Sequence, residues 1–191
     1  MKEITFGYAL CGSFCTFRQS IDEMRHIARE GYPILPIMSQ NACTTDTRFG
    51  RAEDFISEIE EICSAKILKT IVETEPIGPK KLVDLLIVSP CTGNTLGKLA
   101  NGITDTSVTM AAKSALRIGL PVLLAPATND AIAASAQNMG RLLNTKHIFF
   151  VPIRQDNPEK KPCSMVADFK QILPAALAAL EGKQIQPVFL Q

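Results

Sequence analysis

Short apolar runs alternate with helical segments along this chain, and this alternation limits the possible folds more than any other feature. The run LVDLLIV (82–88) resembles a central parallel strand that is covered on both faces. Similar runs predict strands at 4–11, 32–38, 82–88, 121–127 and 147–153, with a further short strand around 67–72. Apolar residues at helical spacing predict helices at 14–30, 52–63, 94–101, 106–118, 130–143 and about 166–181. The stretches 39–51 and 154–165 are polar and are predicted to be loops.

Strands and helices in this order predict the α/β class, as a single doubly wound parallel sheet with helices on both faces. The expected architecture is a Rossmann/flavodoxin-like three-layer sandwich. The 191 residues contain no internal repeat or low-complexity linker, so we expect one domain spanning 1–191.

Charge and hydropathy exclude several classes of protein. The formal net charge is +1, so the balance of charges favours neither nucleic acid nor an anionic membrane as the main partner. The first residues, MKEITFGYALCGSF, lack the features of a signal peptide, and no apolar run approaches the roughly 20 residues of a membrane span. These features predict a cytoplasmic protein that is not anchored in a membrane.

Six cysteines are scattered along the chain without a CxxC pair, and only two histidines accompany them. Neither the spacing of the cysteines nor the small number of histidines is typical of a zinc site, so no metal is expected. In a cytoplasmic chain of this length we expect reduced and mostly buried thiols.

The loops that follow the predicted strands carry small or hydrogen-bonding residues, and in such sheets ligands bind beyond the carboxyl ends of the strands. The first loop, CGSFCT, places Gly12 and Ser13 where a helix begins, and exposed N–H groups at such a position favour a phosphate. The loop does not match GxGxxG, so a monophosphate fits it better than a dinucleotide. A simple turn with a helix cap explains the same two residues, and both interpretations stay open at this stage.

A second loop, SPCTGNT (89–95), contains no large side chain. Thr92 or Asn94 can cap the helix that follows. An exposed backbone of this kind also suits a flat heterocycle with polar edges. The next stretch, KLANGITDTSVTMAAKSALR, is rich in small residues, which favours either an oligomer or a close contact between helices within the chain.

The motif SPCTGNTLGKLANGITD (89–105) resembles the PASANTxxKxANGIxDxL signature of the homo-oligomeric flavin-containing cysteine decarboxylase superfamily. Gly12-Ser13 is similar to the glycine–serine phosphate loop of that family, and PATN (126–129) is similar to its PxMN motif. TDTRFG (45–50), PATNDAIAASAQN and DNPEKKPCSMVADF resemble one branch of it more closely, the B subunits of dipicolinate synthases. The resemblance extends over essentially the whole chain.

This resemblance implies FMN as the cofactor and assigns residues to it. Gly12, Ser13 and Phe14 would hold the phosphate, and Ser39 would add a hydroxyl to the phosphate or ribityl chain. The ring would lie against residues from two further loops, namely Thr92, Gly93, Asn94, Thr95, Ala127 and Asn129.

Three departures from the superfamily concern the reaction. The decarboxylases use a histidine between the second strand and the central motif, whereas this chain has none between His26 and His147. Thr128 stands where PxMN has methionine, and Asn94 stands where the flavin prenyltransferases have lysine. The sequence therefore favours neither decarboxylation nor prenyl transfer.

The dipicolinate branch implies the oxidation of dihydrodipicolinate to dipicolinate during sporulation. It also implies a partner, the A subunit of dipicolinate synthase, which carries an NAD(P)-binding domain. Candidate ligands for the carboxylates of the substrate are Arg48, Arg51 and Asn129, with Arg154 in a further polar loop. The catalytic base is not identified by sequence. The alternatives are an autonomous FMN-dependent decarboxylase-type enzyme and a non-redox module that binds or stabilises the partner.

Overall fold

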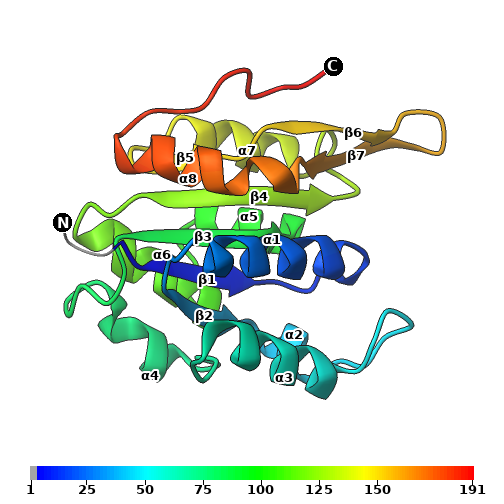
Figure 1. The fold of residues 1–191 in the computed structure, drawn as a ribbon. Coiled ribbons are helices and arrows are strands. Elements are labelled where there is room, and N and C mark those ends of the chain that lie inside the picture. Colours follow the sequence, from blue (N-terminus) through cyan, green and yellow to red (C-terminus); the bar gives the residue numbers. More distant parts are fainter. Residues whose placement is uncertain (1–3) are drawn as a thin grey trace.

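The computed structural model describes residues 4–191, and a seven-stranded sheet forms its centre (Figure 1). The strand order is β2-β1-β3-β4-β7-β6, and β5 pairs with β4. The strands are β1 Phe6–Leu10, β2 Ile34–Met38, β3 Leu85–Cys91, β4 Val122–Thr128, β5 Ile148–Phe150, β6 Ile153–Asn157 and β7 Lys161–Ala167. The first five strands run parallel, whereas β7 pairs antiparallel with β4 and with β6.

Helices cover both faces of the sheet, as the alternating sequence predicts. In Figure 1, α1, α3 and α8 lie on the near face, and α5, α6 and α7 lie on the far face. The longer helices are α1 Phe17–Arg29, α3 Ala52–Cys63, α5 Gly93–Ala100, α6 Ser107–Arg117, α7 Ala136–Leu143 and α8 Ile172–Leu180. The predicted three-layer α/β class is therefore confirmed.

The central strands are buried because both of their faces meet helices. Every residue of β1 and β3 is buried, which explains why these segments are apolar at successive positions rather than at alternate ones. The chain leaves β1 for β2 on one side and returns to β3 on the other. This reversal of strand order opens a crevice between the carboxyl ends of β1 and β3, where ligands bind in folds of this type.

Four local predictions need correction, in addition to the helix predicted at 130–143, which begins only at Ala136. The stretch 154–165 is not a loop, because most of it forms the β6–β7 hairpin. The closing helix, predicted from about 166, begins only at Ile172, since the preceding residues complete β7 and a 3-10 turn, Phe169–Gln171. The polar stretch after β2 contains a short helix, α2 Gln40–Thr44.

The fourth correction concerns the strand predicted around 67–72. Only an isolated bridge joins Leu68 to Ile37, and the chain then forms the short helix α4 Ile71–Thr74. The Thr70 hydroxyl accepts the Glu73 amide at 3.2 Å, and the Glu73 carboxylate accepts the Thr70 amide at 2.8 Å. This capping box, readable as T-I-V-E in the sequence, explains why a helix starts there.

Between residues 4 and 191, none of the helices has both the length and the apolar character that crossing a membrane requires.

Candidate functional site

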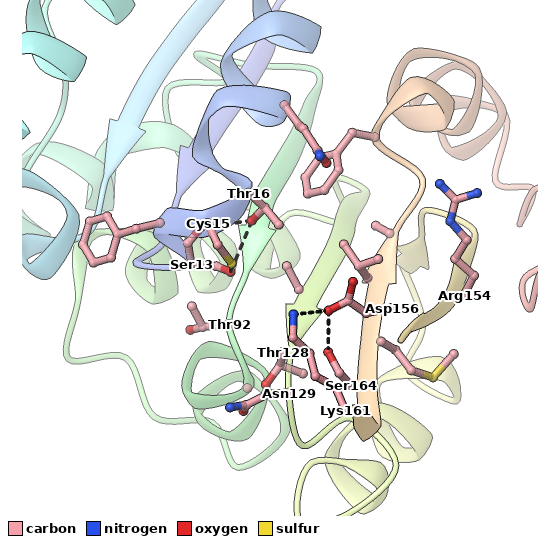
Figure 2. A pocket seen from close by; sticks show the side chains of 18 of the residues that line it. Ser13, Cys15, Thr16, Thr92, Thr128, Asn129, Arg154, Asp156, Lys161 and Ser164 are labelled. Carbon is pink, nitrogen blue, oxygen red and sulfur yellow. Dashed lines mark hydrogen bonds and ion pairs between the residues drawn. The ribbon is translucent and has the colours of Figure 1, made fainter. Parts of the chain in front are cut away.

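A cleft of about 1450 Å³ lies at the carboxyl edge of the sheet, where β1, β3 and β4 end. Ligand pockets commonly measure about 300–1,000 Å³, so this cleft has room for more than one small molecule. It contains most of the residues predicted for cofactor binding, namely Gly12, Ser13, Phe14, Thr92, Gly93, Asn94, Ala127 and Asn129. Figure 2 shows Ser13 and Thr16 on one side of the cleft and the β6–β7 hairpin on the other, with Thr128 between them.

The anion turn, defined here as Gly12–Thr16, connects β1 to α1. The amide N–H groups of Gly12, Phe14 and Cys15 have no acceptor within residues 4–191. The Thr16 hydroxyl lies 3.2 Å from the Ser13 hydroxyl, so two hydroxyls accompany these free amides. Because the turn leads into the 13-residue helix α1, the helix dipole adds partial positive charge at the same place. These donors suit a phosphate group.

The corner between β3 and α5 is built around a helix cap. The Thr92 hydroxyl accepts the amide N–H of Thr95 at 3.2 Å, which confirms the predicted capping role of Thr92. Thr95 itself is buried and donates to the Cys11 sulfur at 3.2 Å, so it joins two strand ends rather than lining the cleft. The exposed Asn94 amide has no partner in the described chain. It is therefore available to a ligand.

The corner after β4 surrounds Gly93 with three oxygens. A Cβ on Gly93 would lie 2.7 Å from the hydroxyls of Ser135 and Thr128 and 2.8 Å from Asp130 Oδ1. Both hydroxyls donate to Asp130 Oδ1, at 3.0 and 2.5 Å respectively. Asp130 lies in the stretch PATNDAIAASAQN, but the sequence analysis assigns it no role in the site. This cluster makes glycine necessary at position 93 and fixes the start of α5.

The β6–β7 hairpin forms a wall of the cleft that the sequence analysis did not predict. Asp156 accepts hydrogen bonds from Lys161 at 2.6 Å and from Ser164 at 3.4 Å (Figure 2). Arg154 lines the cleft and forms no ion pair with any described residue. The hairpin therefore adds a free guanidinium to the site.

The remaining predicted residues lie at different places. Arg48 lines the cleft, with its guanidinium carbon 4.9 Å from the centre of the Phe49 ring. Ser39 caps α2 by accepting the Ala42 amide at 3.3 Å, and it does not line the cleft. Arg51 also lies outside it and pairs with Glu53 at 3.1 Å.

A buried carboxyl lines the cleft on the inner face of α1. Glu23 is only 8% exposed, and its Oε1 has no hydrogen-bond partner among the described residues. Burial raises the pKa of Glu23 above its usual value, and the nearby negative charge of Asp168 raises this pKa further. His26 and the Leu173 amide act in the opposite direction on the same pKa. Helical periodicity alone does not distinguish Glu23 from a surface carboxylate.

The thiols nearest the strand ends are not activated. Cys11 and Cys91 are fully or almost fully buried, and burial raises the pKa of Cys11 to about 11 and that of Cys91 well above its ordinary value. All six cysteines are free, and Cys15 alone among them is exposed within the described chain. A neutral buried thiol is a poor nucleophile, so Cys11 and Cys91 serve the packing of the core.

Comparison with known proteins places the chain in a family. A family model described as Flavoprotein matches residues 1–177. The B subunit of dipicolinate synthase from Bacillus subtilis (strain 168) is 38% identical over 191 residues, which cover 100% of this chain and 96% of that protein. The crystal structure of the B subunit of dipicolinate synthase from Bacillus halodurans C matches with a TM-score of 0.90 and 38% identity, over 100% of this chain and 99% of that chain.

A more distant likeness concerns the fold alone. The FMN-dependent cysteine decarboxylase TvaF from thioviridamide biosynthesis matches with a TM-score of 0.67 and 20% identity, over 94% of this chain and 99% of that chain. The family model and the full-length relatives agree with the architecture described above. The chain therefore belongs to the flavoprotein family, which includes these dipicolinate synthase B subunits.

Proposed function

We propose that this chain is the cytoplasmic, FMN-binding subunit of a two-part dipicolinate synthase, which oxidises dihydrodipicolinate to dipicolinate during sporulation together with its A subunit. The observation that carries the proposal is the cleft itself. It combines the free amides of the anion turn with unpaired side-chain amides from two other strand ends, in a member of the flavoprotein family.

The donor set of the cleft fits FMN. The anion turn offers free N–H groups and the Ser13 hydroxyl to a phosphate, while Asn94 and Asn129 offer donors and acceptors to the edge of a ring. Gly93 and Ala127 keep the surface between them free of large side chains. When bound, the flavin supplies a two-electron acceptor, and the protein orients the reacting groups.

The arginines that line the cleft support a substrate with two carboxylates. Arg48 and Arg154 line it without an ion pair to any described residue, and guanidinium groups bind carboxylates through paired hydrogen bonds. A small dicarboxylate such as dihydrodipicolinate satisfies two such groups. The A subunit is expected to supply an NAD(P)-binding domain, and we expect the chain to form a homo-oligomer.

The autonomous decarboxylase is less well supported. Histidine is absent from the described residues that line the cleft, since His26 is an exposed residue of α1 and His147 precedes β5. Decarboxylation of a cysteine-terminal peptide by the isolated chain would favour that alternative over ours.

The test begins with the absorption spectrum of the purified chain and its titration with FMN. Ser13→Glu places a negative charge in the anion turn and should abolish FMN binding, whereas Ser57→Glu on the exposed side of α3 should not.

Steady-state oxidation is then measured with the A subunit, with and without this chain and FMN. Full activity with the flavin-free chain would contradict a redox role for its flavin and indicate a module that binds or stabilises the partner.

A further inference from the structure

One carboxyl oxygen of Glu23, a residue that lines the cleft, has no hydrogen-bond partner in the described chain, and this missing contact is unexplained. Buried polar atoms in folded proteins nearly always have a hydrogen-bond partner, and leaving one without a partner is unfavourable. Glu23 is 8% exposed, lines the cleft, and has no partner for Oε1 among residues 4–191. A group of a bound ligand would complete this missing contact.

The position of Glu23 relates it to the anion turn. The anion turn leads into α1, which begins at Phe17, and Glu23 lies six residues further along the same helix. At about 1.5 Å per residue, Glu23 lies about 9 Å along the axis from the first turn of the helix. A ligand anchored by its phosphate at the anion turn therefore lies in the cleft that Glu23 also lines.

The charged groups around Glu23 are of both signs. Asp168, which also lines the cleft, acts on Glu23 as a negative charge, and His26 acts from the next turn of α1. Asp22 and Lys170 line the cleft as well, and Asp22 is paired with Arg25 at 2.8 Å. Asp168 and the burial of Glu23 therefore both favour the protonated form of Glu23.

We propose that Glu23 is the group that accepts the proton released when the dihydropyridine ring is oxidised, an inference that rests on the proposed function above. One ring C–H bond breaks, its proton forms an O–H bond with the Glu23 carboxylate, and its electron pair completes the aromatic ring. The neighbouring ring carbon transfers its hydrogen as hydride to the flavin or nicotinamide acceptor. The product is pyridine-2,6-dicarboxylate, and Glu23 returns its proton to water when the product leaves.

A carboxyl of this kind suits general base catalysis. Such a base works best when its pKa lies near the working pH, and a well-placed base contributes about 10²–10⁴-fold to the rate. Asp168 then acts through Glu23, because its negative charge raises the pKa of that carboxyl.

The kinetic test uses the complex of the FMN-loaded chain with the A subunit. Glu23→Gln keeps the size and the acceptor oxygen of the side chain, so FMN affinity should change little and the melting temperature should not fall. The value of kcat should fall about 100-fold or more, and the rise of kcat/KM with pH should disappear. Glu23→Asp should retain part of the rate. Glu30→Gln, at the exposed end of the same helix, is the matched control and should behave as the unmodified chain.

A binding test needs neither turnover nor a variant. Dipicolinate bound beside Glu23 should raise the pKa of that carboxyl, so the FMN-loaded chain should take up protons on binding. Calorimetry in two buffers of different ionisation enthalpy measures this uptake, with and without the A subunit. The proposal predicts uptake by the unmodified chain and by Glu30→Gln, but not by Glu23→Gln.

The outcomes distinguish this inference from the proposed function. If dipicolinate binds without proton uptake, or if Glu23→Gln retains the uptake or a rate within threefold of the unmodified chain, Glu23 is not the proton acceptor and the proposed function stands. If dipicolinate binds to the chain neither alone nor with the A subunit, the proposed function and this inference both fail.

Discussion

At the scale of single residues, we expect FMN binding to depend strongly on the side chain of Asn94. Its amide lines the cleft beside Gly93 and has no partner in the described chain, so its hydrogen bonds are available to the ring edge. Asn94→Leu removes them at similar volume, which should cost about 1–3 kcal/mol of binding free energy and weaken FMN binding about 10- to 100-fold. Quenching of flavin fluorescence on titration measures this effect.

The matched control is Asn144→Leu, which makes the same change at the exposed end of α7. It should leave FMN affinity unchanged. Equal affinity in Asn94→Leu and in the control would show that the ring edge lies elsewhere.

The Glu23 carboxyl also predicts a pH dependence of stability in the unliganded chain. Its pKa is raised on folding above the ordinary value of 4.5, so above that pH the native state binds more protons than the unfolded state. The contribution of this carboxyl is therefore complete below pH 4.5 and is lost as pH rises through the folded pKa. Glu23→Gln should gain stability relative to the unmodified chain as pH rises above 4.5 through the folded pKa, as chemical denaturation at a series of pH values would show. If the two chains gave parallel curves of unfolding free energy against pH, the pKa of Glu23 would not be raised on folding.

At the scale of elements, the contact between α6 and the 3-10 turn Glu75–Ile77 leaves no room for a side chain at Gly78. A Cβ there would lie 1.9 Å from the Ser114 carbonyl oxygen, and the Gly78 amide donates to the Ser114 hydroxyl at 2.8 Å. Gly78→Ala should therefore destabilise the fold by about 1–3 kcal/mol or more.

The same substitution at Gly140 should have the opposite sign. Gly140 lies in α7, a Cβ there meets nothing within 4 Å, and alanine favours the helix by about 0.5–1 kcal/mol. Urea denaturation of the two variants compares them directly. Loss of stability of equal size in both variants would contradict the claim that Gly78 is needed for lack of space.

The elements that the sequence predicts well are those buried on both faces. LVDLLIV identifies β3 because a covered parallel strand leaves no position for a polar side chain except at its ends. The hairpin was not predictable in the same way, because Lys161 and Pro162 are exposed and β6 is mostly polar. Of the two strands, β7 joins the sheet through long-range pairing with β4, which local sequence does not encode, and β6 pairs in turn with β7.

The candidate site shows the same division. Gly12 and Asn94 are readable because each lies in a loop between a predicted strand and the helix that follows it. Arg154 is readable only as a candidate in a polar loop, because the hairpin that brings it to the cleft is not predicted. Glu23 is not readable, since it reaches the cleft through the packing of α1 against Asp168 and α8. Tertiary structure alone brings these charged groups to the cleft.

At the scale of the whole molecule, FMN binding should stabilise the native state by mass action. Ligand at about 100 times its Kd adds about 2.7 kcal/mol, and for a chain of this size each kcal/mol corresponds to about 2–4 °C. The melting temperature of the chain should therefore rise by about 5–10 °C with saturating FMN. Riboflavin, which lacks the phosphate, should give a smaller shift because it does not use the anion turn. Equal shifts with both would contradict the assigned phosphate position.

The pairing of β4 has a consequence for how this scaffold diversifies. The first half of β4 pairs with β5, while its last residues, Ala127 and Thr128, pair with the hairpin strand β7. Changes confined to the hairpin therefore reshape one side of the cleft and leave the parallel strands in register. New ligand preferences are accessible to evolution or to directed mutagenesis in this short segment, without rebuilding the structure that holds the phosphate.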